Sequence, residues 1–205
     1  MERKSHWESV YGSKAPDAVS WYAPHLETSI RLIERVCPTR NCAVLDAGGG
    51  ESTLVDDLLQ AGYENVTVLD ISEKAIDVAR QRLGDSAKRA KWIVGDVTNA
   101  VLPLRAYDVW HDRAVFHFLT RREDRLAYIR QVAASVRSGG FVIVATFGPQ
   151  GPSMCSGLDV VRYDADSLHA EFGDAFRLVE SQTQVHNTPS GTSQQFLYCM
   201  CRIDH

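Results

Sequence analysis

A glycine-rich turn between an apolar segment and a helix-forming segment constrains this chain more than any other feature. The apolar run 43–45 leads through Asp46 into three consecutive glycines at 48–50. Glycine lets the backbone turn sharply and lets a ligand approach it closely. Ser52 and Thr53 follow, and either hydroxyl can cap the helix that the next apolar residues predict. A strand, a glycine turn and a helix N-terminus together predict a nucleotide-binding crevice.

A second apolar segment, 66–71, helps to identify the nucleotide. It contains Asp70, about twenty residues beyond the glycines, where a carboxylate can accept hydrogen bonds from both hydroxyls of a ribose. A dinucleotide site has a third glycine where this chain has Thr53, and Glu51 places a carboxylate where a pyrophosphate would approach. S-adenosylmethionine has no phosphate and carries an ammonium group, so this turn favours S-adenosylmethionine over a dinucleotide.

Four segments, each after a predicted strand, resemble in order the motifs of class I S-adenosylmethionine-dependent methyltransferases. The glycine turn is similar to their first motif, and Asp70 is similar to their ribose-binding acid. Asp96 corresponds to the acid that receives the adenine amino group, and the segment 107–113 to the fourth motif, where methyl donor and acceptor meet. The resemblance implies that the cofactor is contacted by Asp46, Gly48, Gly49, Gly50, Asp70, Ile71, Gly95, Asp96, Val97 and His111.

The remaining pattern predicts a doubly wound α/β fold. Periodicity and punctuation predict helices at 24–36, 72–83, 114–119, 122–136 and 164–172, strands at 91–94, 107–111 and 141–147, and a hairpin of 176–185 with 194–203. The resemblance implies a mostly parallel seven-stranded sheet with a C-terminal antiparallel hairpin and helices on both faces. We expect one domain over 1–205, with an N-terminal lid at 1–37, a cofactor-binding core at 40–147, an acceptor-side loop at 148–163, and a helix and hairpin at 164–205.

Composition narrows the range of partners. The net charge is −4 and no long basic block occurs, so nucleic acid is not expected as the main partner. No apolar run approaches the ~20 residues that a membrane-spanning helix needs. The five cysteines show no metal-ligand spacing, and their odd number without an N-terminal signal segment predicts reduced thiols in a cytoplasmic protein. We expect no metal, and a monomer or homodimer.

Two segments outside the shared scaffold are expected to determine the acceptor. In the first, Trp7, Tyr11 and Trp21 would form a lid over the cofactor, where aromatic faces attract the sulfonium charge; alternatively they only anchor the N-terminus. The second is the irregular loop 148–158, which leaves a central strand at the edge where ligands bind, unless it is an ordinary surface loop. The residues expected to face the acceptor are Tyr22, Cys155, Arg162 and Tyr163.

Methyl transfer is an in-line displacement on an activated carbon, so the protein mainly aligns donor and acceptor. A base is needed only if the acceptor must first lose a proton. The catalytic candidates are therefore His111 or Asp112 as the base, and Arg113, which would hold an anionic acceptor or pair with Asp112. Alternatively, the Asp112–Arg113 pair is structural and His111 contacts only the methionine end of the cofactor.

The fourth motif, His-Asp-Arg-Ala-Val at 111–115, lacks the sequences typical of methyltransferases acting on nucleobases, glutamine amides or ribose. The N-terminal aromatics resemble those of small enzymes that methylate soft nucleophiles such as thiols and sulfide. They also resemble those of protein lysine methyltransferases, whose fourth motif is close to Asp112-Arg113-Ala114. We expect a small-molecule acceptor, with lysine methylation as the main alternative. A non-catalytic S-adenosylmethionine-binding protein and a nicotinamide-dependent oxidoreductase remain further alternatives.

Overall fold

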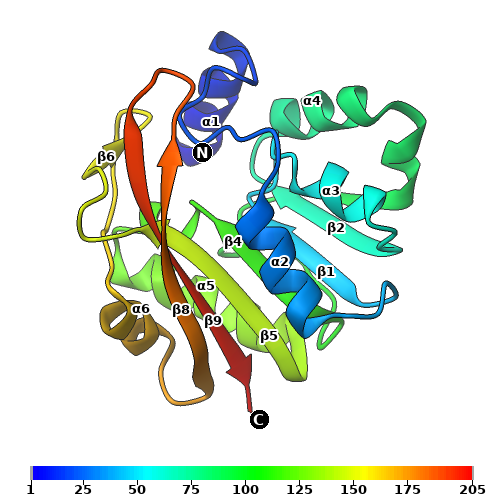
Figure 1. Cartoon of the computed structure of the whole chain (residues 1–205), viewed down its shortest axis with the longest axis vertical. Helices are drawn as coiled ribbons and strands as arrows, with labels where there is room; N and C mark the ends of the chain where they lie inside the picture. Colours follow the sequence, from blue (N-terminus) through cyan, green and yellow to red (C-terminus); the bar gives the residue numbers. More distant parts are fainter. Residues whose placement is uncertain (1, 205) are drawn as a thin grey trace.

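The computed structural model describes residues 2–204, and a seven-stranded sheet in the order β3-β2-β1-β4-β5-β9-β8 forms its centre (Figure 1). The strands are β1 (Ala43–Ala47), β2 (Asn65–Asp70), β3 (Ala90–Val94), β4 (Tyr107–Arg113), β5 (Val136–Phe147), β8 (Phe176–Asn187) and β9 (Ser193–Ile203). The first five pair in parallel, whereas β9 runs antiparallel to both β5 and β8. The predicted mostly parallel sheet with a C-terminal antiparallel hairpin is therefore confirmed.

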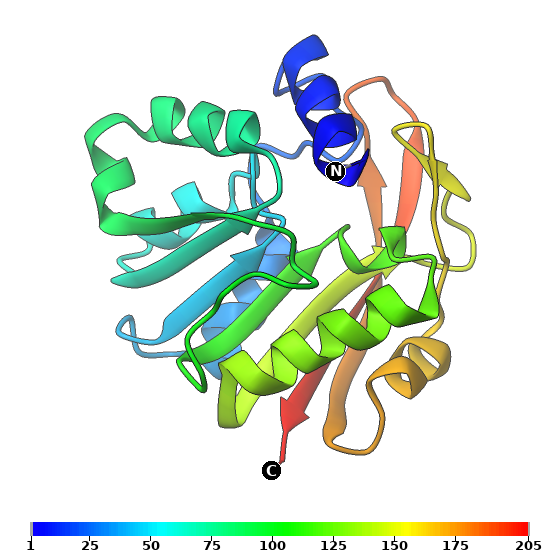
Figure 2. The same cartoon turned by 180° about the vertical axis from the view of Figure 1, so that it is seen from behind.

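Helices cover both faces of the sheet (Figures 1 and 2). They are α2 (Glu27–Val36), α3 (Leu54–Gln60), α4 (Glu73–Leu83), α5 (Arg122–Ser135) and α6 (Ala165–Phe172), whereas α1 (Glu2–Ser13) lies beyond one end of the strands. Side chains of α2 and α3 share one buried cluster with Val44 and Val109, and side chains of α5 and α6 share the other with Leu45 and Trp110. Successive strand residues thus enter opposite cores, as the two-residue period of a strand requires.

Helix ends follow local capping chemistry, with two differences from expectation. The Ser72 hydroxyl accepts a hydrogen bond from the Ala75 N–H at 3.2 Å, so α4 begins where the sequence predicts. The helix expected from residue 24 begins only at Glu27. The Thr53 hydroxyl donates to the Ala23 carbonyl instead of capping α3, while Ser52 Oγ accepts from the Leu54 N–H.

The segment after β4 also differs from expectation. A helix was expected over 114–119, but only a short 3-10 turn, Phe116–Phe118, forms there. The cause is local, because Ala114 has a φ of +74°, which no continuous right-handed helix accommodates. Further along, α5 ends at Ser135 and β5 begins at once with Val136, so no loop separates them. The acceptor-side loop contains a two-residue hairpin, β6 (Met154–Cys155) with β7 (Leu158–Asp159).

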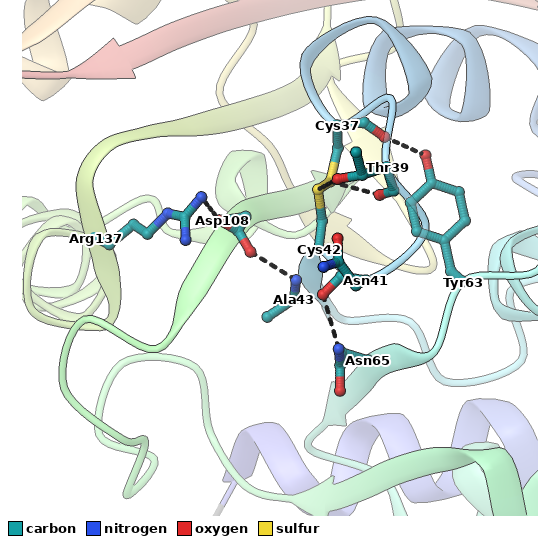
Figure 3. The surroundings of a disulfide bond; sticks show 9 residues. All are labelled: Cys37, Thr39, Asn41, Cys42, Ala43, Tyr63, Asn65, Asp108 and Arg137. Carbon is teal, nitrogen blue, oxygen red and sulfur yellow. Dashed lines mark hydrogen bonds and ion pairs between the residues drawn. A yellow bond between two sulfur atoms is a disulfide. The ribbon is translucent and has the colours of Figure 1, made fainter.

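Cys37 and Cys42 form a disulfide between the end of α2 and the start of β1 (Figure 3). The expectation of reduced thiols is therefore wrong for these two residues, whose Cα atoms lie 6.1 Å apart across a five-residue separation. The Tyr63 hydroxyl donates to the Cys37 carbonyl at 2.9 Å and fixes the loop from the other side. Cys155, Cys199 and Cys201 are buried and free. Within the described part of the chain, no helix has the length and apolarity to cross a membrane.

Candidate cofactor and acceptor site

A cavity of about 380 Å³ opens at the carboxyl ends of β1, β2 and β4, the edge where open α/β sheets bind ligands. Helix α1 and the acceptor-side loop complete its walls. The predicted site residues that line it are Trp7, Tyr11, Trp21, Tyr22, Asp46, Gly48, Asp70, Ile71, Gly95, Asp96, Val97, His111, Arg113 and Cys155. Those that do not line it are Gly49, Gly50, Asp112, Arg162 and Tyr163.

The three glycines are required by close packing around the turn. Gly48 has a φ of +73°, and a Cβ there would lie 2.0 Å from a methyl carbon of Val115. A Cβ on Gly49 would lie 2.4 Å from Asp46 Oδ2, and one on Gly50 would lie 2.6 Å from Asp70 Oδ2. Gly49 and Gly50 therefore leave room for two carboxylates that line the cavity.

Asp70 is held rigidly at the end of β2. Its Oδ2 accepts a hydrogen bond from the Gly50 N–H at 3.0 Å, and its Oδ1 accepts one from the Ser72 N–H at 2.8 Å. Burial raises the pKa of this carboxyl to about 7, although both backbone N–H groups favour the ionised form. The strand end thus presents a pre-positioned acceptor to the cavity, as a ribose-binding acid requires.

A buried chain of hydrogen bonds connects α2 to the cavity. His111 Nε2 lies 2.9 Å from Ser29 Oγ, and His111 Nδ1 lies 2.8 Å from Asp46 Oδ1. All three side chains are buried. The second carboxylate oxygen, Asp46 Oδ2, has no hydrogen-bond partner within residues 2–204. Both ring nitrogens of His111 are therefore occupied, and the free acceptor in this group is Asp46 Oδ2.

Glu51 is a third buried carboxylate at the cavity wall, after Asp70 and Asp46. Neither of its oxygens has a hydrogen-bond partner in the described part of the chain. Burial raises the pKa of this carboxyl to about 7, and the nearby Arg82 charge opposes that rise. From the sequence, Glu51 argues against a phosphate at this turn, but it was not predicted to contact the cofactor. Its position directly after the third glycine was the available signal.

Asp112 and Arg113 fix the polypeptide around the cavity. Asp112 Oδ1 accepts from the Val115 N–H at 2.9 Å, and Oδ2 accepts from the Phe116 N–H and the Tyr128 hydroxyl at 3.1 and 2.7 Å. Asp112 is fully buried and does not reach the cavity, so its geometry favours holding the turn over acting on an acceptor.

Arg113 is engaged in other contacts. It donates to the Trp21 carbonyl at 2.8 Å, and its guanidinium lies 4.4 Å from the centre of the Phe196 ring. These contacts, instead of the expected pair with Asp112, hold the segment before α2 against the sheet.

Helix α1 brings an aromatic cluster over the cavity. The Trp7 ring centre lies 5.0 Å from that of Phe118, 5.8 Å from Tyr11 and 6.0 Å from Trp21. Burial, with the charges of Asp70 and Glu51, raises the pKa of Tyr11 well above its ordinary value. The lid predicted from these aromatics is consistent with this arrangement, in which α1 stands between α4 and the β8–β9 turn (Figures 1 and 2).

Polar contacts fasten α1 to the core. Arg3 forms ion pairs with Asp96, at 3.5 Å, and with Asp124. Glu8 Oε1 accepts a hydrogen bond from the Glu73 N–H at 2.8 Å, at the start of α4. Arg3 could not be predicted from the sequence, because its partners lie 93 and 121 residues away and no local pattern connects them.

The four residues predicted to face the acceptor fall into two groups. Cys155 and Tyr22 line the cavity. Arg162 donates to the Pro149 carbonyl at 3.2 Å, and Tyr163 packs against Phe116 with ring centres 5.8 Å apart, so both stabilise the loop instead of facing the cavity. We name one part of the cavity lining the acceptor end, after the sequence-based prediction that the acceptor binds there. It consists of Val19, Tyr22, Phe118, Leu119, Phe147, Cys155, Leu158 and Asp159.

Comparison with known proteins agrees with this geometry. Residues 44–140 match a family model described as a methyltransferase domain. This match covers slightly less than half of the chain, and the seven-stranded sheet around it has the fold of class I methyltransferases. The cofactor of this family is S-adenosylmethionine, and the unpartnered oxygens of Asp46 and Glu51 beside a glycine turn fit a ligand that carries an ammonium group.

Curated relatives of this methyltransferase domain are distant in sequence. The chain is 28% identical over 157 residues to EEF1A lysine methyltransferase 2 of Danio rerio, covering 70% of this chain and 67% of that protein. It is 25% identical over 138 residues to the eEF1A lysine and N-terminal methyltransferase of Mus musculus, covering 67% of this chain. The match spans only 19% of that mouse protein.

Solved structures share the fold over nearly the whole chain. One, described as "Conversion of a Disulfide Bond into a Thioacetal Group during Echinomycin Biosynthesis", has a TM-score of 0.80 at 19% identity and covers 98% of this chain and 91% of its own. Burkholderia thailandensis 1,6-didemethyltoxoflavin-N1-methyltransferase, with bound 1,6-didemethyltoxoflavin and S-adenosylhomocysteine, has a TM-score of 0.74 at 20% identity. That match covers 99% of this chain and 88% of the Burkholderia enzyme. At these identities the likeness establishes the fold.

Proposed function

We propose that this protein transfers the methyl group of S-adenosylmethionine to a small molecule with a soft nucleophilic atom, a thiol or sulfide above all. One observation carries the choice of acceptor. The polar side chains expected to act as a base are occupied elsewhere, since His111 binds Ser29 and Asp46, and Asp112 binds the turn after β4. At the acceptor end, among the described residues, the one carboxylate is Asp159, and it is exposed.

An acceptor that needs no protein base fits such a site. A thiol ionises in water at an ordinary pKa near 8.5, whereas a lysine ammonium at about 10.4 holds its proton about two pH units longer. The acceptor end is otherwise walled mainly by apolar and aromatic side chains, which suit a small apolar thiol.

The residues of the site then bind, orient and exclude water. S-adenosylmethionine supplies an activated methyl group when bound. We assign Asp70 to the ribose hydroxyls, Asp96 to the adenine amino group and Asp46 Oδ2 to the ammonium group. His111 positions Asp46, and Trp7, Tyr11 and Trp21 cover the sulfonium, where aromatic faces favour a positive charge. Cytoplasmic location and a monomeric or homodimeric state stay predictions from the sequence.

A protein lysine acceptor is the second candidate. It is favoured by the curated relatives, which are named for methylation of eEF1A, and by the Asp112-Arg113-Ala114 sequence of the fourth motif. The two candidates differ in the base that they require. A lysine acceptor needs a group that removes its proton, whereas a thiol acceptor needs none.

An acceptor screen with a pH profile separates the candidates. The protein is incubated with S-adenosylmethionine and, separately, with aliphatic thiols, aromatic thiols, sulfide, amines, lysine peptides and purified eEF1A, and S-adenosylhomocysteine release is measured. We expect release with thiols or sulfide, and a pH inflection that moves with the pKa of each thiol supplied. Turnover with eEF1A alone, or an inflection at the same pH for every thiol, would contradict the proposal.

A further inference from the structure

Glu51 combines two properties that rarely occur together. It is only 5% exposed, and neither carboxylate oxygen has a hydrogen-bond partner in the region that the structure describes. Burying an ionised carboxylate without a partner is strongly unfavourable, so such a group normally becomes protonated or pairs with a cation. Because Glu51 also lines the cofactor cavity, a ligand is the natural source of the missing partner.

Arg82, whose charge acts on Glu51, does not provide a hydrogen bond to this carboxylate. The Arg82 guanidinium donates to the backbone carbonyls of Glu51 and Ser52 at 2.9 and 2.7 Å and to the Asp56 carboxylate at 3.0 and 2.6 Å. Its charge reaches Glu51, but its hydrogen bonds go elsewhere. The other titratable groups that act on Glu51 or respond to it are Asp70 at the end of β2 and Tyr11 on α1. Neither is a cation.

We propose that the Glu51 carboxylate binds the ammonium group of S-adenosylmethionine, and that cofactor binding drives this carboxylate into its ionised form with release of a proton. An ammonium offers three N–H donors, which suit both Glu51 and Asp46 Oδ2, whereas a sulfonium offers none. The inference rests on the cofactor and is independent of the acceptor's identity.

The proposal gives cofactor affinity a defined pH dependence. In the ligand-free protein, the pKa of Glu51 is about 7, so a large share of the molecules carries a proton there at neutral pH. Binding selects the ionised form, so affinity rises as pH rises from 6 to 8. Asp70, with a pKa also about 7, faces the same cavity and adds its own contribution. The difference between the wild type and Glu51→Gln isolates the part that belongs to Glu51.

Isothermal titration calorimetry tests this directly. S-adenosylmethionine, S-adenosylhomocysteine and 5′-methylthioadenosine are titrated into both proteins between pH 6 and pH 8, in buffers of different ionisation enthalpy. At pH 8 we expect Glu51→Gln to bind the first two about tenfold more weakly, because both carry the ammonium, and to release fewer protons at pH 7 than the wild type. We expect 5′-methylthioadenosine, which lacks the ammonium, to bind both proteins equally.

Two further measurements separate a binding role from a structural one. Without ligand at pH 8, Glu51→Gln should melt at a higher temperature than the wild type, because an unpartnered buried charge has been removed. Asp56→Asn, which alters the exposed carboxylate that Arg82 contacts, should leave cofactor affinity unchanged. The proposal is overturned if Glu51→Gln melts lower, binds S-adenosylmethionine as tightly as the wild type at pH 8, or weakens 5′-methylthioadenosine equally. Failure to find a thiol acceptor would leave these binding results unaffected.

Discussion

The ligand-free protein should become less stable as the pH rises from 5 to 8, in part because of Asp70. Burial raises the pKa of this carboxyl in the folded protein to about 7, while the unfolded chain has the ordinary value near 3.9. Between these values the folded state holds a proton that the unfolded state has lost. The contribution of protonated Asp70 to the free energy of unfolding is therefore fully present below about pH 4, and it is lost as the pH rises to 7.

The size of the effect follows from the same values. Between pH 5 and pH 7 the folded state binds up to one proton more than the unfolded state. Each pH unit over which this difference persists lowers the free energy of unfolding by about 1.36 kcal/mol, so the loss over two units is at most about 3 kcal/mol. Asp70→Asn removes this titration. The amide keeps one acceptor for the Gly50 and Ser72 N–H groups and loses the other, which costs about 1–2 kcal/mol at every pH. The variant should thus be about as stable as the wild type at pH 5 and more stable than the wild type by about 2–3 kcal/mol at pH 8.

Urea unfolding followed by tryptophan fluorescence at pH 5 and pH 8 measures this change. Taking the difference between wild type and variant at each pH cancels the contribution of His117, whose pKa burial lowers to about 3. It also cancels the part of the Glu51 contribution that burial causes, and leaves the smaller part that the Asp70 charge adds. Asp56→Asn, on the exposed face of α3, serves as the control and should show no pH-dependent difference of this size. An unfolding free-energy difference between wild type and Asp70→Asn that is equal at both pH values would refute the reasoning.

Three other changes probe the site's supports. Ser29→Ala removes the partner of His111 Nε2, so urea unfolding should show a loss of about 1–3 kcal/mol in the free energy of unfolding. Calorimetry should show weaker S-adenosylmethionine binding, and unchanged binding would argue against the positioning role of His111. Arg3→Ala breaks the ion pairs of the lid, and stopped-flow fluorescence should show faster S-adenosylhomocysteine dissociation without a large loss of stability; an unaltered rate would mean that these pairs do not hold the lid. Cys37→Ser removes the disulfide to Cys42 and should lower the free energy of unfolding by about 2 kcal/mol, according to the chain-entropy relation. A reductant should destabilise the wild type by the same amount and should have no effect on the variant.

Local sequence patterns were sufficient for the scaffold and for part of the cofactor site. The glycine turn, Asp70 and the cap at Ser72 each depend on residues close together in the chain, where spacing and backbone chemistry decide the outcome. The parallel arrangement then brings the carboxyl ends of neighbouring strands to one edge, which explains why Asp46, Asp70 and His111 all line the cavity.

Tertiary contacts between distant segments decided the rest. No spacing rule connects Ser29 with His111, which lie 82 residues apart, so the sequence could not reveal that both ring nitrogens of this histidine are occupied. Asp112 looked like a base because of its place in the fourth motif, yet the left-handed backbone at Ala114 lets the turn fold back onto its carboxylate. The Cys37–Cys42 disulfide likewise depends on how α2 ends beside β1.

A crystal structure of the protein bound to S-adenosylhomocysteine tests the central claim most directly. The prediction is that the ligand occupies the cavity below α1, with Asp70 accepting hydrogen bonds from the ribose hydroxyls and Asp46 Oδ2 accepting one from the ammonium group. An empty cavity at saturating ligand, or a ligand whose ribose lies away from Asp70, would contradict it.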